Sequence, residues 1–597
     1  MTLKRLPVAA LAGLTALTSG PGATGQPRRA AGDGTPSADA CAELGFRTQP
    51  PRQDYGRMVG MARPAPAYAP MPPPPPAPPP MAKTMPSIPP LPVPPVERRL
   101  VPPSAQEAVV SAQRYQYAPP QPMDTERYPN ATANPIKQTV TDPVSTFSVD
   151  VDTAAYSNVR RFLNDGVRPP PDAVRVEEMV NYFDYGYARP QDRSAPFSSY
   201  VALAPSPWSS QRQILHVGIQ GFDIPKGEQP PLNLVFLIDT SGSMSSDDRL
   251  PLAQKSLSLL IDQLRPQDRV AMVAYAGSAG AVLAPTDGRQ KLKMRCALNA
   301  LHSGGSTAGG QGLSLAYALA KENFDPKAVN RVILVTDGDF NVGVADPSKL
   351  KDFVAEKRKD GVYLSVYGYG RGNYNDTMMQ ALAQNGNGTA AYVDSLQEAR
   401  KLFRTDFTKS LFPIADDVKI QIEFNPAQVS EYRLIGYETR MLNREDFNND
   451  QVDAGEVGAG ASVTALYEIT PAGAQPSADP LRYGGKAAPA PSAAGELAYL
   501  KIRYKLPGQS TSKLIERPIT RADLKPSLQA APEPTRWAVA VAGFGQKLKQ
   551  DPRVTAAFGW NDIVTLAQAG RGDDPFGERA EFVQLVRAAA DARSPSD

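Results

Sequence analysis

Short apolar runs alternate with amphipathic stretches through the middle of the chain. The apolar runs cover residues 234–238, 270–274, 332–335 and 362–366. Each is short and apolar enough to be a strand that is buried on both faces of a sheet. The stretches with helical spacing include residues 257–264, 313–322, 349–359, 377–384 and 396–404. This alternation predicts a doubly wound α/β domain over residues 229–410, with its binding residues beyond the carboxyl ends of the strands.

Strand-like segments with apolar and polar residues in alternation flank this domain on both sides. They cover residues 200–204 and 214–218 before it, and 418–424, 432–437, 463–469 and 497–506 after it. Neither group alone has enough strands for a stable two-sheet β-sandwich. We therefore expect residues 191–228 and 411–525 to form one β-rich domain into which the α/β domain is inserted, with 214–218 and 418–424 in the same sheet.

The two ends of the folded part have a helical pattern. Residues 136–190 are expected to be mainly helical, and residues 526–597 to form a small helical C-terminal region. In the C-terminal region the apolar positions include Val539, Phe544, Ile563, Phe582 and Val586. Such positions are typical of the core faces of two or three helices.

The N-terminal residues predict export. Lys4 and Arg5 precede an apolar stretch over residues 6–18, and small residues follow, which is the pattern of a signal peptide over residues 1–25. No later apolar stretch is long enough for a transmembrane helix. Cys41 lies too far beyond the apolar stretch to accept a lipid. We therefore expect a periplasmic or cell-envelope protein without a lipid anchor, with association to the outer membrane or the surface as an alternative.

A proline-rich segment separates the signal from the folded part. Residues 26–135 contain the proline run at 72–80 and are expected to be a disordered, extended linker. Because Cys41 falls in this segment and Cys296 in an expected helix, we do not expect the two cysteines to pair.

Composition excludes several classes of function. The chain of 597 residues has 64 Lys and Arg against 61 Asp and Glu, so it lacks the basic surplus of a nucleic-acid-binding protein. It has 2 Cys and 2 His, which rules out a Cys/His zinc cluster. His216 lies in an apolar strand pattern and is expected to be a packed residue rather than a catalytic base.

Oxygen-bearing side chains follow the apolar runs of the central domain. Asp239, Ser241 and Ser243 come directly after the first run, Thr307 lies in a glycine-rich loop, and Asp337 follows the run at 332–335. Carboxylates and hydroxyls are the ligands that hard divalent cations prefer. These five residues therefore predict a divalent-cation site, with Mg²⁺ favoured and Mn²⁺ or Ca²⁺ as alternatives.

These five residues resemble, in order, the metal-ion-dependent adhesion site of von Willebrand factor type A (VWA) domains. The resemblance implies a Rossmann-like fold and a cation that keeps one coordination position for a carboxylate of a partner protein. The segments at 147–162 and 174–183 and at 368–376 and 432–438 are similar to an exported bacterial family with a central VWA domain. That likeness extends from about residue 134 to the C-terminus.

A second acidic segment resembles a calcium-binding loop. Its alternating oxygen ligands are Asp446, Asn448, Asp450, Asp453 and Glu456. Gln451 and Val457 stand where the glycine and the last glutamate of an EF-hand loop belong, so an acidic, solvated turn is the alternative.

Three functions are compatible with the sequence. The favoured one is an extracytoplasmic, non-enzymatic module that binds an Asp or Glu of a partner protein through the cation. A metal-dependent hydrolase is the first alternative, although hydroxyl ligands supply no adjacent base. A scaffold whose metal is purely structural is the second.

Overall fold

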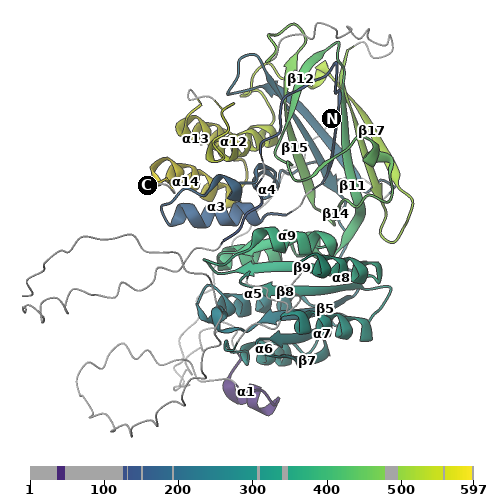
Figure 1. The fold of residues 1–597 in the computed structure, drawn as a ribbon, viewed down its shortest axis with the longest axis vertical. Coiled ribbons are helices and arrows are strands. Elements are labelled where there is room, and N and C mark those ends of the chain that lie inside the picture. The colour runs from purple at the N-terminus through teal and green to yellow at the C-terminus, as the bar shows by residue number, and fades with distance from the viewer. Residues whose placement is uncertain are drawn as a thin grey trace, which may run out of the picture.

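The computed structural model describes residues 36–47, 126–130, 132–149, 152–190, 194–305, 309–338, 347–477, 495–554 and 558–594. The expected signal peptide, most of the expected linker and Thr307 lie outside these ranges. In the described part the chain forms three bodies: a central α/β domain, a two-sheet β domain and a cluster of helices (Figure 1). No helix of this part is long and apolar enough to cross a membrane.

The central domain has a mixed sheet between two layers of helices. Its strands, in spatial order, are β10 (Ala390–Val393), β9 (Val362–Tyr369), β8 (Val329–Thr336), β5 (Leu232–Asp239), β6 (Arg269–Tyr275) and β7 (Ala279–Asp287). All neighbours are parallel except β7, which runs antiparallel to β6. Every residue of β5 is buried, as its continuous apolar run predicts for the central strand. The doubly wound prediction is confirmed.

Helices cover both faces of this sheet. One face packs against α5 (Leu250–Gln263) and α6 (Lys291–Asn299), and the other against α7 (Gly309–Glu322), α8 (Pro347–Lys359) and α9 (Asp376–Asn385). The domain ends with α10 (Leu396–Arg400), the π-helical turn η4 (Lys401–Thr405) and α11 (Phe407–Leu411).

Two sheets pack face to face to form the β domain. The first has the order β1 (Lys137–Gln138), β12 (Val429–Ile435), β15 (Ser462–Pro471), β4 (Gln213–Gly221) and β3 (Phe197–Pro205). The second has the order β13 (Met441–Leu442), β2 (Val144–Ser148), β11 (Pro413–Phe424), β16 (Glu496–Lys505) and β17 (Lys513–Thr520), with β14 (Gly455–Gly458) paired to β11. Apolar side chains of both sheets share one core, in which the rings of Phe424 and Tyr432 stack with centroids 4.2 Å apart.

Strands from both sides of the central domain do pair, so the predicted insertion into a β-rich domain is confirmed. β4 precedes the insertion and β15 follows it, and the two are antiparallel neighbours. The expectation that 214–218 and 418–424 share a sheet is wrong, because β4 and β11 lie in opposite sheets. Alternating patterns fix which side chains point inward, but they do not determine which of the two sheets a strand joins.

The helical cluster combines the two ends of the folded part. It consists of α3 (Ala154–Asn164), α4 (Val176–Asn181), α12 (Glu533–Leu548), α13 (Trp560–Ala569) and α14 (Glu578–Asp591). Their apolar faces form one core around the fully buried Trp537. Residues 136–190 therefore supply α3 and α4 as expected, but they also supply strands β1 and β2.

Two expectations for the N-terminal part are wrong where the structure describes it. Residues 38–43 of the expected linker form the short helix α1 (Ala38–Glu43), and Cys41 makes a disulfide with Cys296 in α6. Farther on, Arg127 forms a β-bridge with Asn375, and Glu126 pairs with Arg161 at 2.8 Å. Both described portions are thus fastened to the folded body.

Candidate functional site

Four of the five expected metal ligands lie at the carboxyl edge of the central sheet. Asp239 is the last residue of β5, and Asp337 directly follows β8, the parallel neighbour of β5. Ser241 and Ser243 lie in the turn after β5, where Ser243 belongs to the short 3-10 turn η3 (Gly242–Ser245). Because parallel strands end at the same edge, residues nearly 100 positions apart in the chain meet there.

The turn after β5 is held in shape by its own backbone and by the next loop. Oδ1 of Asp239 accepts a hydrogen bond from the Ser241 backbone N–H at 2.8 Å, and the Ser241 and Ser243 hydroxyl oxygens are 2.9 Å apart. The backbone N–H of Gly304 donates to the Thr240 carbonyl at 2.8 Å, and the N–H of Gly242 donates to the Gly305 carbonyl at 3.0 Å. The start of the glycine-rich loop that carries Thr307 is therefore docked on the serine turn.

Burial and the repulsion between like charges affect the ionisation of the carboxylates at this edge. Asp239 and Asp337 have no exposed surface. Burial raises the pKa of Asp239 from 3.8 to about 6; hydrogen bonds from Ser241 oppose this rise, and the nearby Asp337 charge adds to it. A cation placed beside these two groups would favour their charged forms.

The donors at this edge fit a hard divalent cation. All of them are oxygens, from two carboxylates and from hydroxyls that face each other at short range. In the described part of the chain, no three His, Cys, Asp or Glu side chains gather as a metal cluster. A cation at this edge would therefore depend on serine and threonine hydroxyls.

Arg249 also belongs to this edge, although no sequence motif predicts it. It precedes α5, and its Nη1 donates to Oδ2 of Asp337 at 2.9 Å and to the Ser243 carbonyl at 2.6 Å. Its partners Ser243 and Asp337 lie 6 and 88 positions away in the sequence, and no short motif predicts such contacts.

Side-chain oxygens of the expected calcium loop already accept hydrogen bonds from other protein groups or form ion pairs with them. Oδ2 of Asp446 accepts from the Asn443 backbone N–H at 2.9 Å, and Oδ1 of Asn448 accepts from Arg503 at 2.7 Å. Asp453 forms an ion pair with Arg358, and the Asp450 carboxylate accepts from the Ser512 N–H at 3.4 Å. Calcium binding stays a prediction that this arrangement does not favour.

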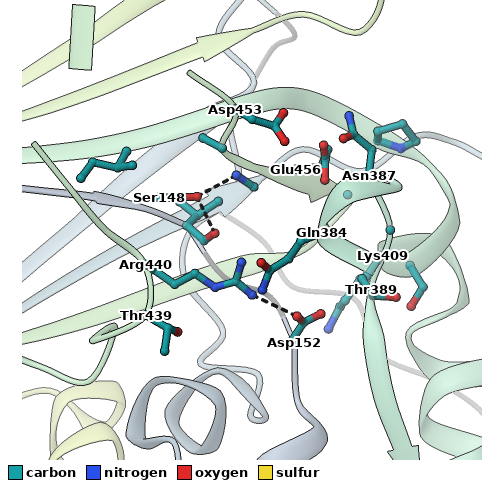
Figure 2. Close-up of a pocket in the computed structure, with 18 of the residues that line it drawn as sticks. Ser148, Asp152, Gln384, Asn387, Thr389, Lys409, Thr439, Arg440, Asp453 and Glu456 are labelled. Carbon is teal, nitrogen blue, oxygen red and sulfur yellow. Dashed lines mark hydrogen bonds and ion pairs between the residues drawn. The ribbon is translucent and has the colours of Figure 1, made fainter. Parts of the chain in front are cut away.

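Glu456, the last residue of that loop, lines a pocket between the central and β domains, with a volume of about 220 Å³ (Figure 2). Burial, and then the nearby Asp416, raise the pKa of Glu456 well above 4.5. Two of the other charged residues that line the pocket are paired: Arg440 contacts Asp152 at 3.1 Å, and Lys409 contacts Asp406 at 2.9 Å. This pocket therefore joins the two domains, and we assign it no ligand.

His216 has the environment that its strand pattern predicted. It is fully buried on β4, its Nε2 lies 2.6 Å from the Tyr187 hydroxyl, and its Nδ1 lies 3.0 Å from the Thr535 hydroxyl. Burial lowers its pKa from 6.5 to about 3, so the ring is neutral and structural.

The fold of the central domain and the match of its sequence to a protein family show that this is a VWA-domain protein. The family described as "von Willebrand factor type A domain" matches residues 233–405, which contain all five expected ligands. Two further families match the flanks: "von Willebrand factor" over residues 122–216, and "Uncharacterized protein YfbK, C-terminal" over residues 409–592.

The chain belongs to the family of the uncharacterized protein YfbK of Escherichia coli (strain K12). It is 48% identical to that protein over 472 residues, which are 78% of this chain and 81% of the relative. It is also 31% identical to the uncharacterized protein sll0103 of Synechocystis sp. over 204 residues, which are 34% of this chain and 46% of that one. A solved structure, the von Willebrand factor type A from Catenulispora acidiphila, is 16% identical with a TM-score of 0.38, and the match covers 67% of this chain and 91% of that one.

Proposed function

We propose that this protein binds partner proteins by capturing an Asp or Glu side chain through a divalent cation. The cation would be held by Asp239, Ser241, Ser243, Thr307 and Asp337, and Mg²⁺ is the favoured ion. The bound cation would supply an open coordination position for the partner's carboxylate oxygen. The chain's own residues orient the hydroxyls, and they keep the number of negative charges at the site low.

The observation that carries this proposal is the geometry of the serine turn. The two serine hydroxyls lie 2.9 Å apart, and the buried Asp239 accepts a hydrogen bond from the backbone N–H of Ser241. Hydroxyls are neutral ligands, so a divalent cation bound by them keeps an attraction for an external carboxylate.

We propose an extracytoplasmic location for this binding. The Cys41–Cys296 disulfide supports it, because disulfides form and persist in oxidising compartments. The signal-like pattern of residues 1–25 points the same way. Each of the two observations is independent of the metal site.

We propose no enzymatic activity. Metal-dependent hydrolysis needs a base that accepts a proton from the attacking water. Serine and threonine hydroxyls do not act as such bases without a further partner, and His216 is buried and hydrogen-bonded on both ring nitrogens in the β domain.

Affinity capture from envelope extracts tests the proposal with the Asp239→Ala variant. We expect its capture of partner proteins in Mg²⁺ to fall at least about tenfold, because the serine turn loses the carboxylate that shapes it. EDTA should have the same effect on the unchanged protein. Because burial makes the charged form of Asp239 unfavourable, the variant should remain folded, as circular dichroism would verify.

The matched control is Asp360→Ala. Asp360 precedes β9 at the opposite edge of the same sheet and pairs with Lys321 at 3.2 Å, with 39% of its side chain exposed. Its capture should equal that of the unchanged protein. Capture that survives both EDTA and Asp239→Ala would refute metal-dependent binding.

A further inference from the structure

Arg249 is fixed across the carboxyl edge of the central sheet by four hydrogen bonds. Its Nη1 donates to the Ser243 carbonyl and to Asp337. Its Nη2 donates to the Arg371 carbonyl, and also to the Asn373 side-chain oxygen at 3.0 Å. Only 15% of its side chain is exposed. These contacts direct the guanidinium charge at the predicted metal site.

The loop that accepts two of these bonds is itself held from the other side. Gly370 has φ +78°, and a side chain there would collide with Arg249. Only glycine at this position therefore leaves room for the arginine side chain. The Gly372 N–H donates to Oε1 of Glu126 at 2.9 Å, and Arg371 pairs with Asp165 at 2.6 Å. The acceptors that hold Arg249 at this edge are therefore themselves anchored.

A fixed positive charge changes the charge balance of the site. Of the five predicted ligands only Asp239 and Asp337 carry charge, and Arg249 pairs directly with Asp337. One negative charge thus remains to meet a divalent cation. Nearby like charges repel, so a cation bound there is held weakly until another negative charge is added.

We propose that Arg249 makes cation binding depend on the partner's carboxylate and is therefore a specificity-determining residue. This inference rests on the proposed function. The arginine lowers the affinity of the site for the cation alone, and an incoming carboxylate restores the missing negative charge. By thermodynamic linkage, the cation and the acidic partner then strengthen each other's binding.

Mg²⁺ titration by calorimetry tests this inference with Arg249→Gln and Arg249→Lys. In chloride buffer, Arg249→Gln should bind Mg²⁺ about tenfold more tightly than the unchanged protein, because the repelling charge is gone. Arg249→Lys keeps the charge and should stay within about threefold of the unchanged protein. At equal ionic strength, replacing chloride with acetate as the probe carboxylate should strengthen Mg²⁺ binding to the unchanged protein more than to Arg249→Gln.

The control variant is Arg289→Gln. Arg289 follows β7 at the opposite edge of the central sheet, pairs with Asp287 at 3.1 Å and has 73% of its side chain exposed, so Mg²⁺ affinity should not change. Circular dichroism verifies that each variant is folded.

The outcomes separate this inference from the proposed function. If Arg249→Gln binds Mg²⁺ no more tightly than the unchanged protein, or if Arg249→Lys gains as much as Arg249→Gln, the role of Arg249 is refuted. If Asp239→Ala nevertheless abolishes Mg²⁺ binding in the same titrations, the metal site itself stands. Absence of Mg²⁺ binding by the unchanged protein and by every variant would contradict both.

Discussion

Asp416 on β11 carries a half-buried carboxyl group that favours its protonated form. Burial raises its pKa from 3.8 to about 6, and the neighbouring Asp417 adds to this rise. The Gly508 N–H and Lys505 lower the pKa, but they do not cancel the effect of burial. Glu456 on β14 and the Tyr363 hydroxyl on β9 also face Asp416 and sense its charge.

Asp416→Asn should stabilise the protein at pH 7.5 but not at pH 4. In the unfolded chain the carboxyl ionises near pH 3.8, whereas in the folded chain it ionises near pH 6. Stability is therefore lost as the pH rises between these values, and the penalty stays constant above them. A shift of this size corresponds to about 3 kcal/mol, and partial exposure reduces the expected gain to about 1–2 kcal/mol.

Urea denaturation at both pH values measures this difference. Glu423→Gln is the control: Glu423 lies on the same strand, pairs with Lys501 at 3.7 Å and has 48% of its side chain exposed, so its replacement should bring no gain at pH 7.5. An equal change for Asp416→Asn at pH 4 and pH 7.5 would contradict the explanation based on ionisation.

Among single residues, those in short motifs at strand ends could be predicted from the sequence. Asp239, Ser241 and Ser243 are neighbours in the chain, and the apolar run before them places them at the edge of the sheet. Arg249 could not be found in this way, because its contacts to Asp337 and Asn373 span 88 and 124 positions. A charged residue before a helix usually faces solvent, so its sequence context gives no signal of burial.

At the scale of elements, the short helix α1 is joined to the central domain by a disulfide. A helix of six residues cannot persist alone in water, because nucleation costs more than so few hydrogen bonds return. Cys41 is fully buried and joins α1 to Cys296 in α6, at the end of the central domain seen in Figure 1. The sequence did not indicate this pairing, because the two cysteines are 255 positions apart.

Reduction of the disulfide should release α1 from the central domain. We expect the amide protons of residues 40–46 to lose their protection from exchange in dithiothreitol, and in the Cys41→Ser/Cys296→Ser variant, while α5 keeps its protection. Hydrogen exchange followed by mass spectrometry measures both segments in one experiment. Unchanged protection of residues 40–46 after reduction would mean that packing alone holds α1.

The strands show where sequence patterns stop being informative. Residues 200–204, 214–218, 418–424 and 463–469 all form strands as predicted. Their partners are set by shape across the shared core rather than by the alternation within each strand, so the division into two sheets could not be predicted. The edge strand β7 contains small residues and one proline in place of a strong apolar run, so the sequence pattern does not predict it.

On the scale of the whole molecule, buried ion pairs join the helical cluster to the central domain. Arg160 of α3 contacts Asp394 and Glu398 of the central domain at 2.5 and 2.7 Å, and Glu581 of α14 at 3.1 Å. Arg175 pairs with the buried Asp376 at the start of α9. Breaking such buried pairs is costly, because each would leave an uncompensated charge in the interior. The central domain is therefore held by these contacts as well as by its two chain connections.

This assembly presents one candidate binding edge, and the central claim is that a divalent cation sits there. The most direct test is an anomalous difference map from crystals grown with Mn²⁺. We predict a peak between the hydroxyl oxygens of Ser241 and Ser243, near Asp239 and Asp337. A map without a peak at this edge, or with its strongest peak at residues 446–456, would contradict the claim.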